Sequence, residues 1–315
     1  MATADGPGAG LLRTAADRLE RGWEAVLDHP LVWLAPTLVL LAVFQLYPML
    51  EALRMSLTDA SLLEPGADYV GLANYLDLLT DPEFWGMLRV TAIYAFASVV
   101  FHVLLGLVLA VAIDYGVRRG LYGNVSTRVA VLLAWVVPGI IIGLVWKVML
   151  VESSFGAVNH FLGLVDVGPV PFRSNPTLAL VSTIVAGTWR GTAFTMIMIY
   201  GGLQRIPREL YEAARMDGAG RWARFRYVTI PQLKPVIFVT VVLVTIYALN
   251  TFDLIFALTG GGPGRATQVL SLFMYQEAFT DYKMGRAAAV AVVMLVINLV
   301  LTGAYVYAFD VTEEI

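Results

Sequence analysis

The sequence contains no cysteine and carries little charge. The absence of cysteine among its 315 residues excludes disulfides, thiolate-bound zinc and thiol nucleophiles. Charged residues make up only 14% of the chain, against roughly 25% in soluble domains, whereas 58% of the residues are hydrophobic. A soluble surface of this size needs more charge, so the composition favours a membrane protein. The net charge of −3 also argues against a nucleic-acid partner, which requires a basic face.

Two motifs of enzymes are also missing. The chain has no G-x-x-x-x-G-K-[ST] loop, which cradles nucleotide phosphates, so this chain is not expected to hydrolyse ATP itself. It has no G-x-S-G segment, and His102 is the only histidine inside an apolar span, which argues against an intramembrane serine protease. We therefore expect no catalytic residues, no bound cofactor and no metal site in this chain.

Six apolar stretches are long enough to cross a bilayer, which takes roughly 20 mostly apolar residues. They cover residues 31–50, 90–113, 129–151, 178–203, 236–258 and 287–309. None of them alternates as the strands of a membrane barrel do. The sequence therefore predicts an all-α integral membrane protein with six transmembrane helices. The fourth stretch is the weakest, because Arg190 lies at its centre.

The lysines and arginines are distributed unevenly between the loops. If the N-terminus is inside, thirteen of them fall in inner segments and five in the outer loops, residues 51–88, 152–176 and 259–286. Inner loops of membrane proteins carry the excess of positive charge, so both termini are expected in the cytoplasm. Residues 1–30 are predicted to form a cytoplasmic segment with an amphipathic helix on the membrane surface, and residues 310–315 a cytoplasmic tail.

The inner loop of residues 205–233 is polar and rich in arginine. Pro207 and the helix formers after it predict a short helix, which Gly218 ends because glycine tolerates a left-handed turn. A second short helix is expected from Arg221 to Thr229, stopping at Pro231. The pattern thus predicts two short helices joined at Gly218. The alternative is a solvated basic loop that only sets the topology.

This loop resembles the "EAA" loop of the permease subunits of ATP-binding-cassette importers. The family pattern has E-A-A, three residues, G, nine residues and I-x-L-P. The chain has Glu212-Ala213-Ala214, then Gly218, then Val228-Thr229-Ile230-Pro231 at the same spacing. Val228 and Ile230 replace the usual isoleucine and leucine.

Three further segments resemble carbohydrate-importer permeases, and the last of them points to the maltose and glycerol-phosphate type. They are Tyr69–Tyr75, Asp81–Trp85 and Phe252–Pro263, the last ending in Thr-Gly-Gly-Gly-Pro. The resemblance runs from about Leu31 to the C-terminus, with residues 89–309 as the type 1 transmembrane domain of these importers.

The resemblance implies a prokaryotic cell-membrane permease that moves a sugar, or a related polyol or glycerol phosphate, by alternating access. Its implied partners are a second, different permease, two ATPase subunits that hold ATP and magnesium, and an extracytoplasmic solute-binding protein. The residues implied in coupling to the ATPase are Glu212, Ala213, Ala214, Asp217, Gly218 and Pro231. A secondary transporter, or a permease for a non-sugar solute, is the alternative, although the chain shows no internal repeat.

Polar residues inside the spans are the candidates for the substrate path, because sugars bind to hydrogen-bonding groups and aromatic faces. They are Tyr247, Asn250, Thr251 and Asp253 on the fifth span and Trp189, Arg190 and Thr192 on the fourth. Hydrogen bonds to neighbouring helices are the structural alternative. Treated as continuous helices rising roughly 1.5 Å per residue, the spans favour a pair of Asp253 with Lys147 over a pair with Arg190. His102 is predicted to be a hydrogen-bonded packing residue.

Overall fold

The computed structural model describes residues 30–309, and within this range every regular element is a helix. The only strand-like pairing in that range is an isolated bridge between Thr58 and Tyr69. The prediction of an all-α protein is confirmed. The predicted surface helix and C-terminal tail lie outside the described residues. The chain divides into two units, residues 1–55 and residues 56–315.

The described part of the first unit is one apolar helical run. It comprises α2 (Pro30–Leu41), the π-helical turn η1 (Ala42–Leu46) and α3 (Tyr47–Met55). The wide turn comes directly before Pro48, whose ring would clash with the carbonyl four residues earlier in a regular helix. From Leu31 to Met55 the run is long and apolar enough to cross a membrane, and it continues past the predicted end at residue 50.

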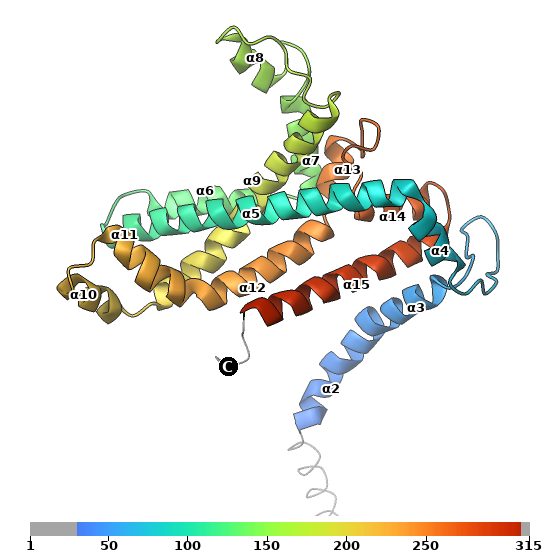
Figure 1. The fold of residues 1–315 in the computed structure, drawn as a ribbon, viewed down its shortest axis with the longest axis horizontal. Coiled ribbons are helices and arrows are strands. Elements are labelled where there is room, and N and C mark those ends of the chain that lie inside the picture. Colours follow the sequence, from blue (N-terminus) through green and yellow to red (C-terminus); the bar gives the residue numbers. More distant parts are fainter. Residues whose placement is uncertain (1–29, 310–315) are drawn as a thin grey trace, which may run out of the picture. The chain divides into compact units, whose positions relative to one another are not determined.

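Five helices form the body of the second unit. They are α5 (Pro82–Arg118), α6 (Asn124–Val136), α9 (Pro176–Arg205), α12 (Ile230–Leu249) and α15 (Met284–Phe309). The most extensive contact is between α5 and α9, and α12 packs against both of them. Helix α15 packs against α12 and against α14 (Leu270–Phe279) (Figure 1).

Small residues allow α5 and α9 to approach closely. A methyl group on Gly191 would lie 2.2 Å from the ring of His102, and one on Gly106 would lie 2.5 Å from Thr195. Glycine at such positions is typical of helix pairs in membranes, where packing replaces the hydrophobic effect. His102 is buried, and its Nε2 lies 3.1 Å from the carbonyl oxygen of Gly187. Its predicted role as a hydrogen-bonded packing residue is confirmed.

By length and composition, the described residues contain four helices able to cross a membrane, or five if a bent pair counts as one span. The four single helices are Leu31–Met55, Pro82–Arg118, Arg221–Leu249 and Met284–Ala308. Helix α9 is not among them, although it has 30 residues. It carries Arg190, and many of its small and polar residues are buried against neighbouring helices, so it needs less lipid-facing apolar surface. The count of six spans stays a prediction.

Two expected spans are broken, which corrects the assumption that they are continuous helices. In residues 129–151, α6 ends at Val136, and α7 (Gly139–Met149) leaves at 99° after Pro138. In residues 236–258, α12 ends at Leu249, and α13 (Asp253–Leu258) starts afresh. The two short helices α7 and α13 pack against each other.

Shorter helices lie at the two ends of the body of the second unit (Figure 1). At one end are α10 (Arg208–Met216), α11 (Arg221–Arg224) and the π-helical turn η2 (Phe225–Thr229), close to the last turn of α5. At the other end lie α4 (Ala73–Thr80) and α14. Helix α8 (Ala157–Gly163) projects from the body beyond α7.

Candidate functional site

The loop after α9 forms the predicted helix and glycine turn. Helix α10 ends at Met216, and Gly218 adopts φ +77°, the left-handed conformation that favours glycine. The N–H of Ala219 donates to the carbonyl of Ala214 at 2.8 Å, and the N–H of Gly218 donates to the carbonyl of Arg215 at 3.0 Å. These bonds close the C-terminus of α10. The predicted first helix and its end at Gly218 are confirmed.

The second helix of the loop does not stop at Pro231, which is a correction. Helix α11, turn η2 and helix α12 form one continuous run from Arg221 to Leu249, 29 residues long. The wide turn η2 ends directly before the helix that contains Pro231. It makes room for the proline ring, so the helix passes through the proline instead of ending there.

One face of this loop is open to solvent in the isolated chain. Glu212, Ala213, Asp217 and Gly218 are exposed, while Ala214 is half-buried. Among the described residues, Glu212 and Asp217 have no basic group within 4.0 Å. On the other face of the loop, the Tyr211 hydroxyl lies 3.1 Å from Thr229 Oγ1 and joins α10 to η2.

A second group of polar side chains gathers at the break between α12 and α13. Arg190 Nη1 lies 3.4 Å from Asp253 Oδ2, and the Arg190 guanidinium lies 5.4 Å from the ring centroid of Tyr247. The side chain of Arg190 is 14% exposed and that of Asp253 is 42% exposed. An ion pair and a cation–π contact therefore join the middle of α9 to the C-terminal end of α12 and to the first residue of α13. We call Arg190, Tyr247 and Asp253 the central cluster.

The pair of Arg190 with Asp253 corrects the predicted pair of Asp253 with Lys147. The prediction treated residues 236–258 as one straight helix, which would carry Asp253 far from Arg190. The helix instead ends at Leu249, and α13 packs against α7 and contacts α9. Lys147 is exposed on α7.

Gly139 completes the central cluster and was missed by the sequence interpretation. A methyl group at this position would lie 2.1 Å from Asp253 Oδ2 and 2.4 Å from Arg190 Nη1. Only glycine leaves room for the ion pair at the start of α7. The dipeptide Pro138-Gly139 inside an apolar run was the available signal, since it marks a break in a helix.

The other candidates for the substrate path divide into two groups. Thr192 and Thr251 are buried, and each donates to a carbonyl of its own helical run, Thr188 at 2.7 Å and Tyr247 at 2.9 Å. These two hydroxyls bond within their own helical runs and not, as the structural alternative expected, to neighbouring helices. Asn250 is exposed at the end of α12, with Nδ2 donating to the carbonyl of Ile246 at 2.7 Å, and Trp189 is half-exposed.

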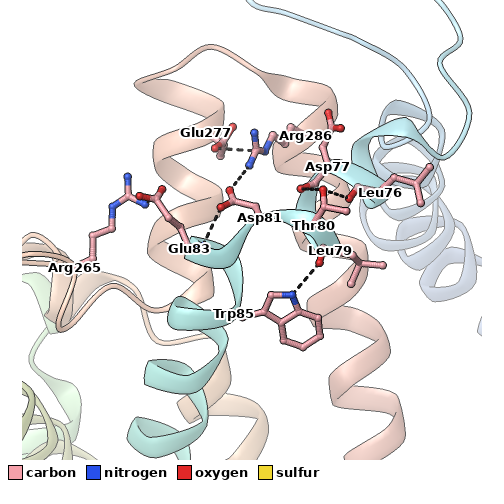
Figure 2. Close-up of polar contacts among 10 residues, drawn as sticks. All are labelled: Leu76, Asp77, Leu79, Thr80, Asp81, Glu83, Trp85, Arg265, Glu277 and Arg286. Atoms are coloured by element: carbon pink, nitrogen blue, oxygen red, sulfur yellow. Dashed lines mark hydrogen bonds and ion pairs between the residues drawn. The ribbon is translucent and has the colours of Figure 1, made fainter.

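A polar network ties together the opposite end of the second unit, as Figure 2 shows. Arg286 at the start of α15 lies 2.9 Å from Asp81, which caps α5, and 3.6 Å from Glu277 of α14. Glu277 is buried, and its Oε2 has no hydrogen-bond partner. Burial raises the pKa of the Glu277 carboxyl, with Arg286 acting in the opposite direction. Arg265 also pairs with Glu83 (Figure 2).

Among residues 30–309, no group of three or more histidine, aspartate or glutamate side chains is arranged to hold a metal ion.

Relatives of known kind share this architecture. The trehalose/maltose transport system permease protein MalF of Thermococcus litoralis is 37% identical over 88% of this chain and 92% of its own length. The sn-glycerol-3-phosphate transport system permease protein UgpA of Agrobacterium fabrum is 31% identical over 87% of this chain and 92% of its length. A bacterial ABC transporter that imports the acidic polysaccharide alginate contains a chain with a TM-score of 0.78 and 22% identity, covering 94% of this chain and 98% of that one.

These features define the membrane-embedded subunit of a transport system. A helical body with broken apolar spans encloses a charged pair, and an exposed helical loop projects from one end. The chain belongs to the family of binding-protein-dependent transport system inner membrane components, whose model matches residues 102–309. The resemblance to ABC-importer permeases of the maltose and glycerol-phosphate type is confirmed.

Proposed function

We propose that this chain is a permease subunit of an ATP-driven sugar importer in the cell membrane of a prokaryote. The observation that carries the proposal is the exposed loop of α10 and α11, with Glu212 and Asp217 unpaired within the described chain and Gly218 in its left-handed turn. Unpaired carboxylates on an exposed helix suit contact with a partner protein. The relatives are named for trehalose and maltose and for sn-glycerol 3-phosphate, which favours a sugar or a related polyol phosphate.

The proposed partners follow the family's mode of action. A second, homologous permease would complete the pore, two ATPase subunits would hold ATP and magnesium, and an extracytoplasmic binding protein would deliver the solute. A solved alginate importer was crystallised in complex with a pentasaccharide-bound periplasmic protein, which supports the last of these partners. The ATPase would contact Glu212, Ala213, Ala214, Asp217 and Gly218.

The route from the loop to the central cluster is a single helix. The run from Arg221 to Leu249 is continuous, and Tyr247 near its end contacts Arg190. A displacement of α10 and α11 would therefore move Tyr247 relative to Arg190 on α9. Pro231 would lie inside this run, in the first turn of α12, instead of marking a helix end. We propose that ATP-driven closure acts on the substrate path through this helix.

The proposed substrate path passes the central cluster and Asn250. A guanidinium, a carboxylate and an amide offer donors and acceptors to sugar hydroxyls, and Tyr247 offers an aromatic face to the C–H groups. Polar side chains in a span face protein or a cavity instead of lipid. Trp189, half-exposed beside Arg190 in sequence, is assigned to the same path, whereas Thr192 and Thr251 are assigned to packing.

The coupling role is tested with two variants and two matched controls. Glu212→Lys reverses the exposed charge that meets the ATPase, and Gly218→Trp deforms the left-handed turn. Both should abolish ATP-driven uptake while the protein still inserts. Glu209→Lys makes the same charge change one turn earlier, and Gly220→Trp places the same side chain on an ordinary backbone at φ −68° with open space around it.

Uptake is measured with the co-encoded binding protein over a panel of sugars, together with co-purification of the ATPase. Both controls should retain uptake. Normal uptake and normal ATPase co-purification in Glu212→Lys and Gly218→Trp would reject the coupling role. Uptake of a non-sugar solute alone by the wild type would reject the assignment to sugars.

A further inference from the structure

A pocket of about 750 Å³ lies between the end of α5 and the loop of α10 and α11. Its lining comes from α5, α9, α10, α11 and η2 and their borders, and its arginines are Arg118, Arg119, Arg215, Arg221 and Arg224. We call it the arginine pocket. It lies at the end of the second unit that the distribution of positive charge predicts to be cytoplasmic.

The arginine pocket has a large excess of positive charge. Five of its lining residues are arginines, and its only acidic one is Asp114. Asp114 is already engaged, because Oδ2 accepts from Arg118 at 2.7 Å and Oδ1 accepts from Gln204 at 2.9 Å. Within the described residues, the other four arginines have no carboxylate within 4.0 Å. Like charges gathered without counter-charges are unfavourable, so an anion is the missing component.

The contacts of these arginines also indicate that an anion binds here. Arg224 Nε is buried and has no hydrogen-bond partner in the described structure. The guanidinium groups of Arg119 and Arg221 lie 4.7 Å and 6.0 Å from the ring of Tyr115, which brings the end of α5 and the start of α11 onto one aromatic side chain. The C-termini of α5 and α10 attract cations, but a helix end supplies only about half a unit charge. Several arginine donors remain free for an oxyanion.

The rest of the pocket lining is largely apolar and aromatic. Val111 and Leu203 lie on α5 and α9, and Phe225 and Trp222 close the loop side, with ring centroids 5.5 Å apart. Trp222 is 74% exposed, as tryptophan commonly is at the boundary between lipid and water. A free phosphate ion would use only the arginines, whereas a molecule with a phosphate and a hydrocarbon portion would use both kinds of wall.

We propose that the arginine pocket binds the phosphate headgroup of an anionic phospholipid from the cytoplasmic leaflet. Arginine forks bind phosphate oxygens bidentately, and basic pockets between helices on this side of the membrane suit acidic headgroups. The bound headgroup would link the end of α5 to the loop that the proposed function assigns to the ATPase. The site is distinct from the central cluster.

The test uses the purified transporter complex in a neutral detergent, with phosphatidylglycerol, phosphatidylcholine and inorganic phosphate as probes. Lipid adducts are counted by native mass spectrometry over a concentration series. The wild-type complex should bind phosphatidylglycerol in preference to phosphatidylcholine. Arg221→Gln/Arg224→Gln removes two free arginines, each contributing about fivefold in affinity, so binding should weaken by about 25-fold.

Two matched variants separate the site from general effects of charge and folding. Arg208→Gln/Arg226→Gln removes the same charge from the same loop outside the pocket and should bind like the wild type. Arg221→Lys/Arg224→Lys keeps the charge and should retain most of the affinity. Melting of each complex in detergent shows whether it is folded.

Equal loss in both glutamine variants, or loss in neither, would overturn the proposal. Displacement of phosphatidylglycerol by inorganic phosphate at millimolar concentration would assign the pocket to a soluble phosphate ester and reject the lipid. Because binding is measured without transport, this result is independent of the test of the coupling role.

Discussion

The ion pair of Arg190 and Asp253 joins two charged side chains at the centre of the second unit. A charge in an apolar environment is costly unless it is paired, and removal of one partner strands the other. Here Arg190 is 14% exposed and has Tyr247 on one side and Asp253 on the other, while Gly139 leaves space for both charged groups. Removal of either side chain would therefore leave the other without its charged partner.

Asp253→Asn should destabilise the protein by about 2 kcal/mol, less than the roughly 3–5 kcal/mol of a fully buried pair, because the Asp253 side chain is 42% exposed. Arg190→Gln should have a similar effect, and Arg190→Gln/Asp253→Asn should cost less than the sum of the two. Thermal inactivation of the purified complex gives the interaction energy through this double-mutant cycle. Lys147→Gln, which changes the partner that the sequence favoured, should be silent. Additive effects of the two single changes would disprove the pairing.

At the scale of helices, the sequence predicted positions well and directions poorly. Apolar runs located the helical segments, because the length and hydropathy of a run can be read directly from its residues. The same property cannot show that the axis bends by 99° between α6 and α7, or that α13 starts afresh at Asp253. Pro138 was a visible signal of the first break, but no proline marks the second. The pair of Arg190 and Asp253 was therefore out of reach of a straight-helix calculation.

The loop of residues 205–233, which we call the coupling loop after its proposed role, likewise combines one correct and one wrong prediction. Gly218 was predicted correctly, because its left-handed φ of +77° is a local property of glycine. Pro231 was misplaced as a helix end, because the π-helical turn at Phe225–Thr229 accommodates its ring. A π-helical turn inserts one extra residue into a helix before a proline, and the residue types around it show no pattern that predicts the insertion.

The network of α5, α14 and α15 predicts a dependence of stability on pH. The folded state raises the pKa of Glu277 through burial, so it binds a proton more tightly than the unfolded state does. Stability should therefore fall as the pH rises from the ordinary carboxyl range through the raised pKa. Arg286, Lys283, Asp281 and Asp81 all act on Glu277 in its folded position.

Glu277→Gln keeps the shape and removes the titration, so this variant should melt at a higher temperature than the wild type above that pH window. Below the window the two should melt alike. The measurement is the melting temperature of the complex in detergent as a function of pH. Glu83→Gln is the control, because it makes the same change at an exposed carboxylate that pairs with Arg265 in the same network (Figure 2). A wild-type profile in Glu277→Gln would show that another group titrates.

At the scale of the whole molecule, the distribution of arginine joins orientation to function. The loop with α10 and α11 holds six of the twelve arginines predicted to be inside, and the arginine pocket lies against it. If the excess of positive charge marks the cytoplasmic side, this loop lies where the proposed ATPase partner would meet it. The opposite end carries balanced pairs, Arg286 with Asp81 and Arg265 with Glu83, as suits an end facing outward.

This orientation can be tested directly, because the chain has no cysteine to remove first. Asp68→Cys, Asp217→Cys and Asp281→Cys make the same change at three exposed positions, one in the coupling loop and two in the loops predicted to be outside. A membrane-impermeant maleimide applied to intact cells should label residues 68 and 281, whereas residue 217 should react only after the membrane is permeabilised. Asp68→Cys and Asp281→Cys must first show normal uptake, and Asp217→Cys, which changes a proposed ATPase contact, must first be present in the membrane at the wild-type amount. Labelling of residue 217 but not of residue 68 in intact cells would invert the orientation and would remove the coupling loop and the arginine pocket from the cytoplasmic side together.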